Sequence, residues 1–237
     1  MKTIIFISIV LVSGALAGFV HGTVNFAIVE PYLDQAIGIE NQSLFASGEA
    51  EDTLEFWAEY ESYRTWQKSG QVLAGVILGV AMGSLFGIVY ALSRNSLPGK
   101  TDVTKAVILS LIMWITIYLI PFLKYPANPP TVGDGDTVIL RAVLYVSFIA
   151  ISGISALLFY KISKKFQNNK KYLGILGYGI FISVVFFAMP ENPDNITAPM
   201  NLVTEFRFMS ILGVTSFWGS IGIILGLFWK KFDNDKS

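Results

Sequence analysis

The sequence predicts an all-helical membrane protein, a bundle of about six transmembrane helices. Its composition is one reason, since 53% of the 237 residues are hydrophobic and 14% are charged, against roughly 25% charged residues in soluble domains. The length of the apolar runs is a second reason, because about 18 to 25 helical residues cross a hydrocarbon core of about 30 Å. Within each run the apolar residues are continuous rather than alternating, which favours helices over strands.

Six such runs follow one another along the chain, each bounded by charged residues or prolines. They cover residues 4–29, 70–92, 104–123, 138–160, 171–189 and 208–229. An A-x-A-like pattern at Ala15 and Ala17 also resembles a signal-peptide cleavage site. Because the first run continues to Val29, longer than a signal peptide needs, we expect the first helix to be retained. The whole chain, residues 1–237, then forms a single integral membrane domain.

The charge distribution predicts the orientation, because cytoplasmic loops of membrane proteins are rich in Lys and Arg. If both termini are cytoplasmic, the inner segments carry 12 basic and 3 acidic residues. The outer segments, residues 30–69, 124–141 and 190–207, then carry 5 basic and 14 acidic residues. We therefore predict a multi-pass protein of the cell membrane, embedded in lipid, with both termini in the cytoplasm. The net charge of zero gives no indication of nucleic-acid binding.

Two of the predicted helices carry glycines at four-residue intervals, which predicts close helix packing. Small residues at this spacing form a groove that lets helix backbones approach closely in lipid. The glycines are Gly14, Gly18 and Gly22 in the first helix and Gly75, Gly79, Gly83 and Gly87 in the second.

The single histidine, His21, shares the glycine-lined face of the first helix with Asn25. An ionisable residue within a membrane is a functional hypothesis by default. An imidazole beside an amide or carboxylate oxygen suits cobalt, nickel or zinc, so His21 and Asn25 are candidate metal ligands. In the alternative interpretation, the two side chains form hydrogen bonds with neighbouring helices.

The segment of residues 30–69 is predicted to be extracytoplasmic, acidic and rich in aromatic residues. Glu51, Glu55 and Glu59 repeat at four-residue intervals beside several tyrosines and tryptophans. This pattern is typical of a helix at the membrane interface. In one interpretation Glu40 and these three glutamates attract cations to an acidic vestibule. In the other, they form a solvated face beside an aromatic belt.

The sequence favours no enzymatic site. There is no cysteine and only one histidine, so thiolate metal sites and the common histidine-based catalytic sites have no support. We therefore expect a protein that is not an enzyme and that binds no permanent cofactor.

Several stretches of the sequence resemble the CbtA family of predicted cobalt transporter subunits. They are "GALAGFVHGTVNFAIVEPYLDQAIGIE", "PFLKYPANPPTVGDGDTVILRAVLY" and "FRFMSILGVTSFWGSIG", the last preceded by "MPE". The residues at the recurrent proline and arginine positions of the family are Pro31, Pro129, Pro130, Arg141, Pro190 and Arg207. Many relatives carry an acidic segment after the first helix, in which Ala36 and Glu40 fit and Ile37 replaces an acidic residue. If that carboxylate binds an ion, this chain must use Glu30 or Asp34.

The resemblance implies a membrane subunit of a cobalt uptake system, linked to cobalamin supply, with the cobalt ion as transported substrate. It also implies a small single-span partner, a CbtB-like subunit with a histidine-containing end, and about five spans where six apolar runs are present here. An alternative from a different class is a non-transporting assembly or sensory subunit that binds partner proteins.

Overall fold

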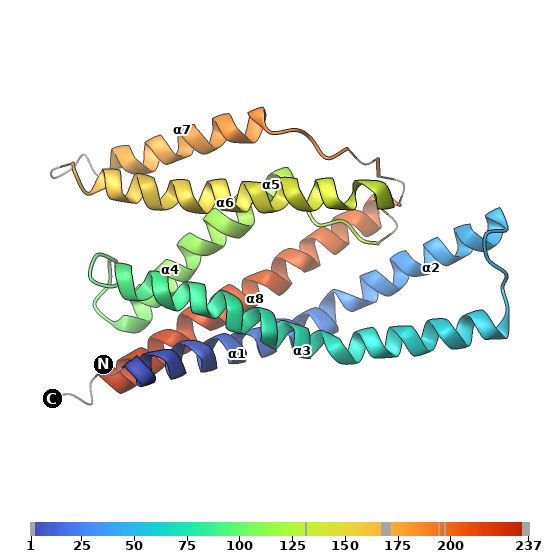
Figure 1. Ribbon diagram of the computed structural model, residues 1–237, viewed down its shortest axis with the longest axis horizontal. Helices are drawn as coiled ribbons and strands as arrows, with labels where there is room; N and C mark the ends of the chain where they lie inside the picture. The colour runs from blue at the N-terminus through green and yellow to red at the C-terminus, as the bar shows by residue number, and fades with distance from the viewer. Residues whose placement is uncertain (1–2, 131, 167–171, 194, 197, 234–237) are drawn as a thin grey trace. The chain divides into compact units, whose positions relative to one another are not determined.

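The computed structural model describes residues 3–130, 132–166, 172–193, 195–196 and 198–233, and every regular element within them is a helix (Figure 1). The helices are α1 (Thr3–Ile28), α2 (Glu30–Ser47), α3 (Leu54–Ser93), α4 (Asp102–Trp114), a π-helix (Ile115–Leu119), α5 (Ile120–Lys124), a 3₁₀ turn (Gly135–Thr137), α6 (Val138–Ser163), α7 (Tyr172–Ala188) and α8 (Met200–Asp233). The predicted class, an all-helical polytopic membrane protein, is confirmed.

Within the described residues, five helical stretches are long and apolar enough to cross a membrane. They are Thr3–Ile28, Leu54–Ser93, Asp102–Lys124, Gly135–Ser163 and Met200–Phe232. The run predicted at residues 171–189 corresponds to α7, whose 17 residues span only about 25 Å of a core about 30 Å thick. Residue 171 lies outside the described residues, as do Lys2, Lys170 and Lys236, which contributed to the predicted orientation. The cytoplasmic placement of both termini stays a prediction.

The helices gather into two compact units. The first contains Met1–Leu111, Asn128–Thr131 and Ala198–Ser237, and the second contains Ile112–Ala127 and Val132–Thr197. The first unit therefore holds α1, α2, α3 and α8 with most of α4. The second holds the π-helix, α5, α6 and α7.

In the first unit, α1 and α3 pack backbone against backbone along their glycines. A Cβ atom placed on Gly79 would lie 2.5 Å from Gly18 Cα, and one on Gly83 would lie 2.5 Å from Gly14 Cα. Gly75 faces Gly22 in the same way, at 2.9 Å from its Cα, while a Cβ on Gly22 would meet Val72 Cα at 2.9 Å and one on Gly87 would meet the side chain of Val10. Any larger residue would force the helices apart, so these glycines fix both the contact and its register.

Beyond this contact, α2 and the first half of α3 form a long arm, defined here as residues 30–70. Pro31 stands in the first turn of α2 and has no N–H to continue the hydrogen-bond ladder of α1, so a new helix begins at Glu30. The 40 residues of α3 extend about 60 Å, twice the thickness of a hydrocarbon core. Figure 1 shows α2 continuing from α1 and α3 returning from the far end of the arm.

The tip of the arm is closed by aromatic residues and helix caps. Phe45 of α2 packs edge-to-face on Phe56 and Trp57 of α3, with ring centroids 5.0 and 5.9 Å away. Gly48 ends α2 at a φ of 76°, which favours glycine. The Thr53 hydroxyl accepts a hydrogen bond from the Phe56 N–H at 3.2 Å and caps α3.

The second unit contains a π-helical turn stabilised by side chains. The Ile120 N–H donates to the Ile115 carbonyl, five residues back. In this register the residue at position 121 would donate its N–H to the Thr116 carbonyl, but Pro121 has no N–H. The Ser152 hydroxyl of α6 donates to that carbonyl instead, and the Tyr178 hydroxyl of α7 lies 2.8 Å from Ser152 Oγ. One polar chain thus connects three helices.

Candidate functional site

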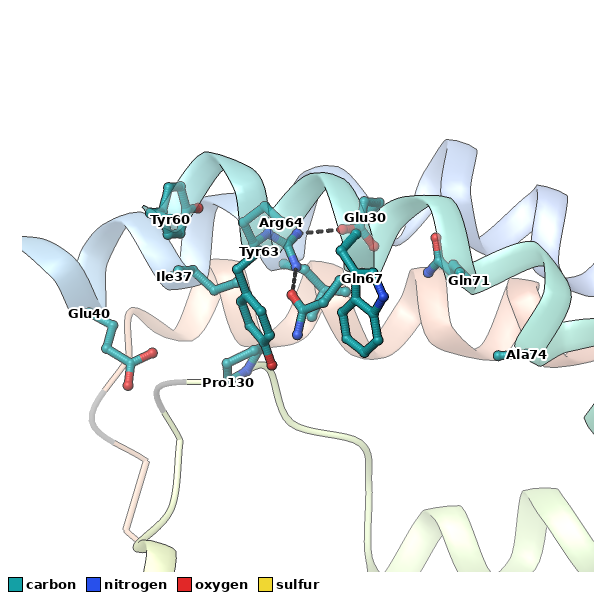
Figure 2. A pocket seen from close by; sticks show the side chains of 13 residues that line it. Glu30, Ile37, Glu40, Tyr60, Tyr63, Arg64, Gln67, Gln71, Ala74 and Pro130 are labelled. Atoms are coloured by element: carbon teal, nitrogen blue, oxygen red, sulfur yellow. Dashed lines mark hydrogen bonds and ion pairs between the residues drawn. The ribbon is translucent and has the colours of Figure 1, made fainter. Parts of the chain in front are cut away.

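An open groove of about 740 Å³ lies in the first unit, between α2 and α3 at the base of the arm. Its walls combine apolar, aromatic, amide and charged side chains. The lining residues are Glu30, Leu33, Ile37, Glu40, Tyr60, Tyr63, Arg64, Trp66, Gln67, Gly70, Gln71, Ala74 and Pro130. Figure 2 shows Arg64 between Glu30 and Gln67, with Gln71 farther along α3.

Arg64 is the centre of an ion-pair network that joins α3 to α2. Its Nη2 atom donates to Glu30 and, at 2.8 Å, to Asp34 Oδ1, while Nη1 donates to Gln67 Oε1 at 2.7 Å. Lys68 Nζ donates to Asp34 Oδ2 at 2.7 Å. The two carboxylates stand one turn apart on α2, and the two cations stand one turn apart on α3, so the faces are complementary.

The two halves of this network differ in burial. The side chains of Glu30 and Arg64 are only 8% and 10% exposed, whereas those of Asp34 and Lys68 are 41% and 32% exposed. Burial raises the pKa of the Asp34 carboxyl, but hydrogen bonds from Lys68 and Arg64 outweigh this effect and hold it below its ordinary value. Asp34 is therefore a carboxylate at neutral pH, with water on one side.

Aromatic residues form the outer wall of the groove. Tyr63 and Trp66 stack with ring centroids 6.0 Å apart and remain 58% and 70% exposed. Tyr60 is half-buried and Glu40 is exposed. The groove therefore offers aromatic faces and a carboxylate to a cation arriving from water.

Another wall comes from Pro130, in the segment of residues 128–130. Arg207 of α8 donates from Nη2 and Nε to Asn128 Oδ1, at 2.7 and 3.3 Å. Pro129 is fully buried and Pro130 lines the groove. Three of the family-motif residues thus hold this segment beside the arm, while Pro31 sets the start of α2.

The other two motif residues lie in the second unit. Arg141 donates from Nε to Thr137 Oγ1 at 3.2 Å and from Nη2 to the Asp134 carbonyl at 3.1 Å. The Pro190 carbonyl accepts a hydrogen bond from the Tyr125 hydroxyl at 2.5 Å. The first contact joins α6 to the turn that precedes it, and the second joins the residue that follows α5 to the loop after α7.

His21 and Asn25 form a hydrogen-bonded joint between α1 and α8. His21 Nδ1 lies 2.8 Å from the Gly213 carbonyl, and Asn25 Nδ2 lies 3.1 Å from His21 Nε2. A carbonyl only accepts, so Nδ1 carries the proton and Nε2 accepts from the amide. Both ring nitrogens of the buried imidazole are therefore engaged.

The structure brings the candidate metal ligands together only in pairs. Glu30 and Asp34 share Arg64, whereas His21 and Asn25 bond to each other. Over the part of the chain that the structure describes, no group of three or more His, Cys, Asp or Glu side chains could hold a metal ion. Of the four glutamates predicted to attract cations, Glu40 lines the groove, whereas Glu51, Glu55 and Glu59 are exposed elsewhere on the arm or its connecting loop.

Sequence reasoning missed the residues that neutralise the carboxylates, Arg64 and Lys68, and the amides Gln67 and Gln71. One signal was present: two acidic residues four apart, followed after a turn by two basic residues four apart. Such spacing predicts facing charged stripes on two antiparallel helices.

Comparison with known families agrees with these features. The sequence model of the CbtA family, described as a probable cobalt transporter subunit, matches residues 3–230. Neither the comparison with curated proteins nor that with solved structures gives a match. With five membrane-length helices in its described part, the chain is a multi-pass membrane protein, and it belongs to the CbtA family of probable cobalt transporter subunits.

Proposed function

We propose that this chain is the membrane subunit of a cobalt uptake system and that its groove is the outer vestibule for the ion. The observation that carries the proposal is Glu30, a carboxylate buried at the base of an open groove where the arm leaves the membrane helices. Intramembrane and interfacial carboxylates commonly mark ion pathways. In this proposal the arm projects from the outer face.

The charge pattern of the arm supports cation capture. Glu40, Glu51, Glu55 and Glu59 are exposed along the arm and the loop at its tip, and such acidic surfaces raise the local concentration of cations. The donors in the groove are carboxylate and amide oxygens, which suit a cation that keeps part of its water shell. The groove therefore gathers the hydrated ion, and tighter ligands act after it.

In this proposal the four candidate metal ligands act in two stages, Glu30 and Asp34 before His21 and Asn25. The carboxylates receive the ion first. His21 can bind only if its ring releases Asn25 or Gly213, because both nitrogens are engaged. A small single-span CbtB-like partner with a histidine-containing end would supply imidazoles that this chain has in only one copy, and the imported cobalt would serve cobalamin synthesis.

Uptake of radioactive cobalt by cells that lack or express the chain, in low-cobalt medium, tests this function. We expect accumulation to fall when the chain is deleted and to recover when it is restored together with its partner. Unchanged accumulation after deletion would contradict transport. Unchanged accumulation with loss of a partner protein from the membrane would instead favour the assembly or sensory subunit.

A further inference from the structure

We propose that a divalent cation binds Glu30 and Asp34 by exchange with the side chains that now neutralise them. Arg64 and Lys68 leave the carboxylates, and the Arg64 guanidinium moves within the groove to Glu40. The inference rests on the proposed function, because it describes how the same groove takes up and releases its ion.

The exchange leaves the total charge around the two carboxylates unchanged. Two carboxylates face one guanidinium and one ammonium group, with contacts of 2.7 and 2.8 Å at Asp34 and a direct contact at Glu30. A divalent cation carries the same total charge as the two basic side chains. Replacement therefore leaves no net charge at the buried Glu30, where an unpaired charge is strongly unfavourable.

The difference in burial orders the steps. The Asp34–Lys68 pair is half-exposed, so an incoming ion reaches it from water. The Glu30–Arg64 pair is almost completely buried, so Glu30 can release Arg64 only when another cation replaces it. The ion therefore meets Asp34 first and displaces Arg64 second.

Arg64 has a second position available in the groove that it lines. Its buried Nε–H has no hydrogen-bond partner among the described residues, so its present position leaves one donor unsatisfied. Glu40 lines the same groove as an exposed carboxylate, and Tyr60 and Tyr63 offer aromatic faces suited to a guanidinium. Glu40 thus stabilises the displaced arginine without touching the metal.

Two amides supply further oxygen ligands once Arg64 leaves. Gln67 Oε1 is now the acceptor of Arg64 Nη1 and becomes free. Gln71 Oε1 is a buried acceptor in the same groove and has no donor among the described residues. A metal ion with its waters satisfies both oxygens, which together with two carboxylates form an all-oxygen set.

Titration of Co²⁺ into the purified full-length protein in detergent, followed by calorimetry, tests the exchange. Removal of the competing cation by Arg64→Gln should tighten cobalt binding about tenfold or more, and Lys68→Gln should tighten it several-fold. Glu40→Gln should weaken binding several-fold in the wild-type background but much less together with Arg64→Gln, where only its general attraction for cations is lost. Glu61→Gln, an exposed acid outside the groove, is the matched control and should bind as the wild type does.

Equal effects of Glu40→Gln in both backgrounds would overturn the exchange, because Glu40 would then act on the ion directly. Unchanged affinity in both Arg64→Gln and Lys68→Gln, or no cobalt binding by any variant, would also overturn it. If Arg64→Gln does not fold, Lys68→Gln alone decides, since its half-exposed side chain is less important for folding. Removal of this competing cation should still tighten cobalt binding several-fold, and unchanged affinity would overturn the exchange. If the binding experiments reject the exchange but cellular cobalt uptake still depends on the chain, the proposed function stands. If the binding experiments support the exchange but uptake does not depend on the chain, only the proposed function is rejected.

Discussion

At Arg64, one guanidinium connects α3 to α2 through two carboxylates and also bonds to an amide of its own helix. It bonds to Glu30, Asp34 and Gln67, and it is almost fully buried. Removal of one partner from a buried ion pair typically costs about 3 to 5 kcal/mol, because the other charge is left uncompensated. The arm is therefore held by a contact that also determines whether Glu30 can meet another cation.

His21 illustrates a different use of a polar residue within the membrane. It joins α1 to α8 through the Gly213 carbonyl and packs edge-to-face on Phe217, with ring centroids 6.2 Å apart. We predict that His21→Ala lowers the free energy of unfolding by about 1 to 3 kcal/mol, since Asn25 also loses its acceptor. Thermal unfolding in detergent measures this effect.

Thr23→Ala is the matched control for this prediction. Thr23 lies on the same helix, is exposed, and donates to the Phe19 carbonyl of its own helix at 2.8 Å. Its removal should change the unfolding temperature little. Equal melting of His21→Ala and the wild type would show that the joint does not stabilise the bundle, and cobalt uptake by the same variant tests its place on the ion route.

At the scale of elements, the glycine contact of α1 and α3 sets the register between the two helices that lead into the arm. We predict that Gly79→Ala destabilises the protein by about 1 to 3 kcal/mol or more, because its Cβ would lie 2.5 Å from Gly18 Cα, and backbone atoms cannot yield as a side chain can. Gly219→Ala is the control, since that Cβ meets nothing within 4 Å. Chemical unfolding of both variants in detergent tests the difference, and equal stability would refute the contact.

The same contact explains which part of the site the sequence could predict. Apolar length alone predicts the spanning helices, because the bilayer imposes it. The pairing of Glu30 with Arg64 needs the register between two helices, which composition does not supply. Gly18 faces Gly75 and Gly79. Because the helices are antiparallel, the position twelve residues after Gly18 in the sequence lies opposite the position about twelve residues before the facing glycines, and these positions are Glu30 and Arg64.

Apolar patterns predict neither the π-helix nor the short length of α7, although they do predict an apolar run at residues 171–189. The π-helix adds one residue to a helical turn without changing the hydrophobic run, so only Pro121 hints at it. Its stability depends on the hydrogen bond from Ser152 to Thr116, which are 36 residues apart in the sequence, and on the contact of Ser152 with Tyr178, which are 26 residues apart. The short α7 is equally apolar, and only its boundaries separate it from the five membrane-length helices.

For the whole molecule, the orientation of the arm is the first open prediction. The chain has no cysteine, so single introduced cysteines can be labelled without background. A cysteine at Glu49, in the loop at the tip of the arm, should react with an impermeant maleimide in intact cells. A cysteine at Ser96, between α3 and α4, should react only after permeabilisation. The reverse pattern would place the groove in the cytoplasm and contradict capture from outside.

The most direct measurement of the central claim is cobalt uptake by cells that express groove variants at equal membrane abundance. Glu30→Gln together with Arg64→Gln removes both buried charges and leaves the Asp34–Lys68 pair in place, so no buried charge stays unpaired and folding should persist. We predict that chain-dependent cobalt accumulation falls about tenfold or more in this double variant, while Glu61→Gln accumulates cobalt as the wild type does. Full cobalt accumulation by the double variant would contradict the groove as the route of the ion.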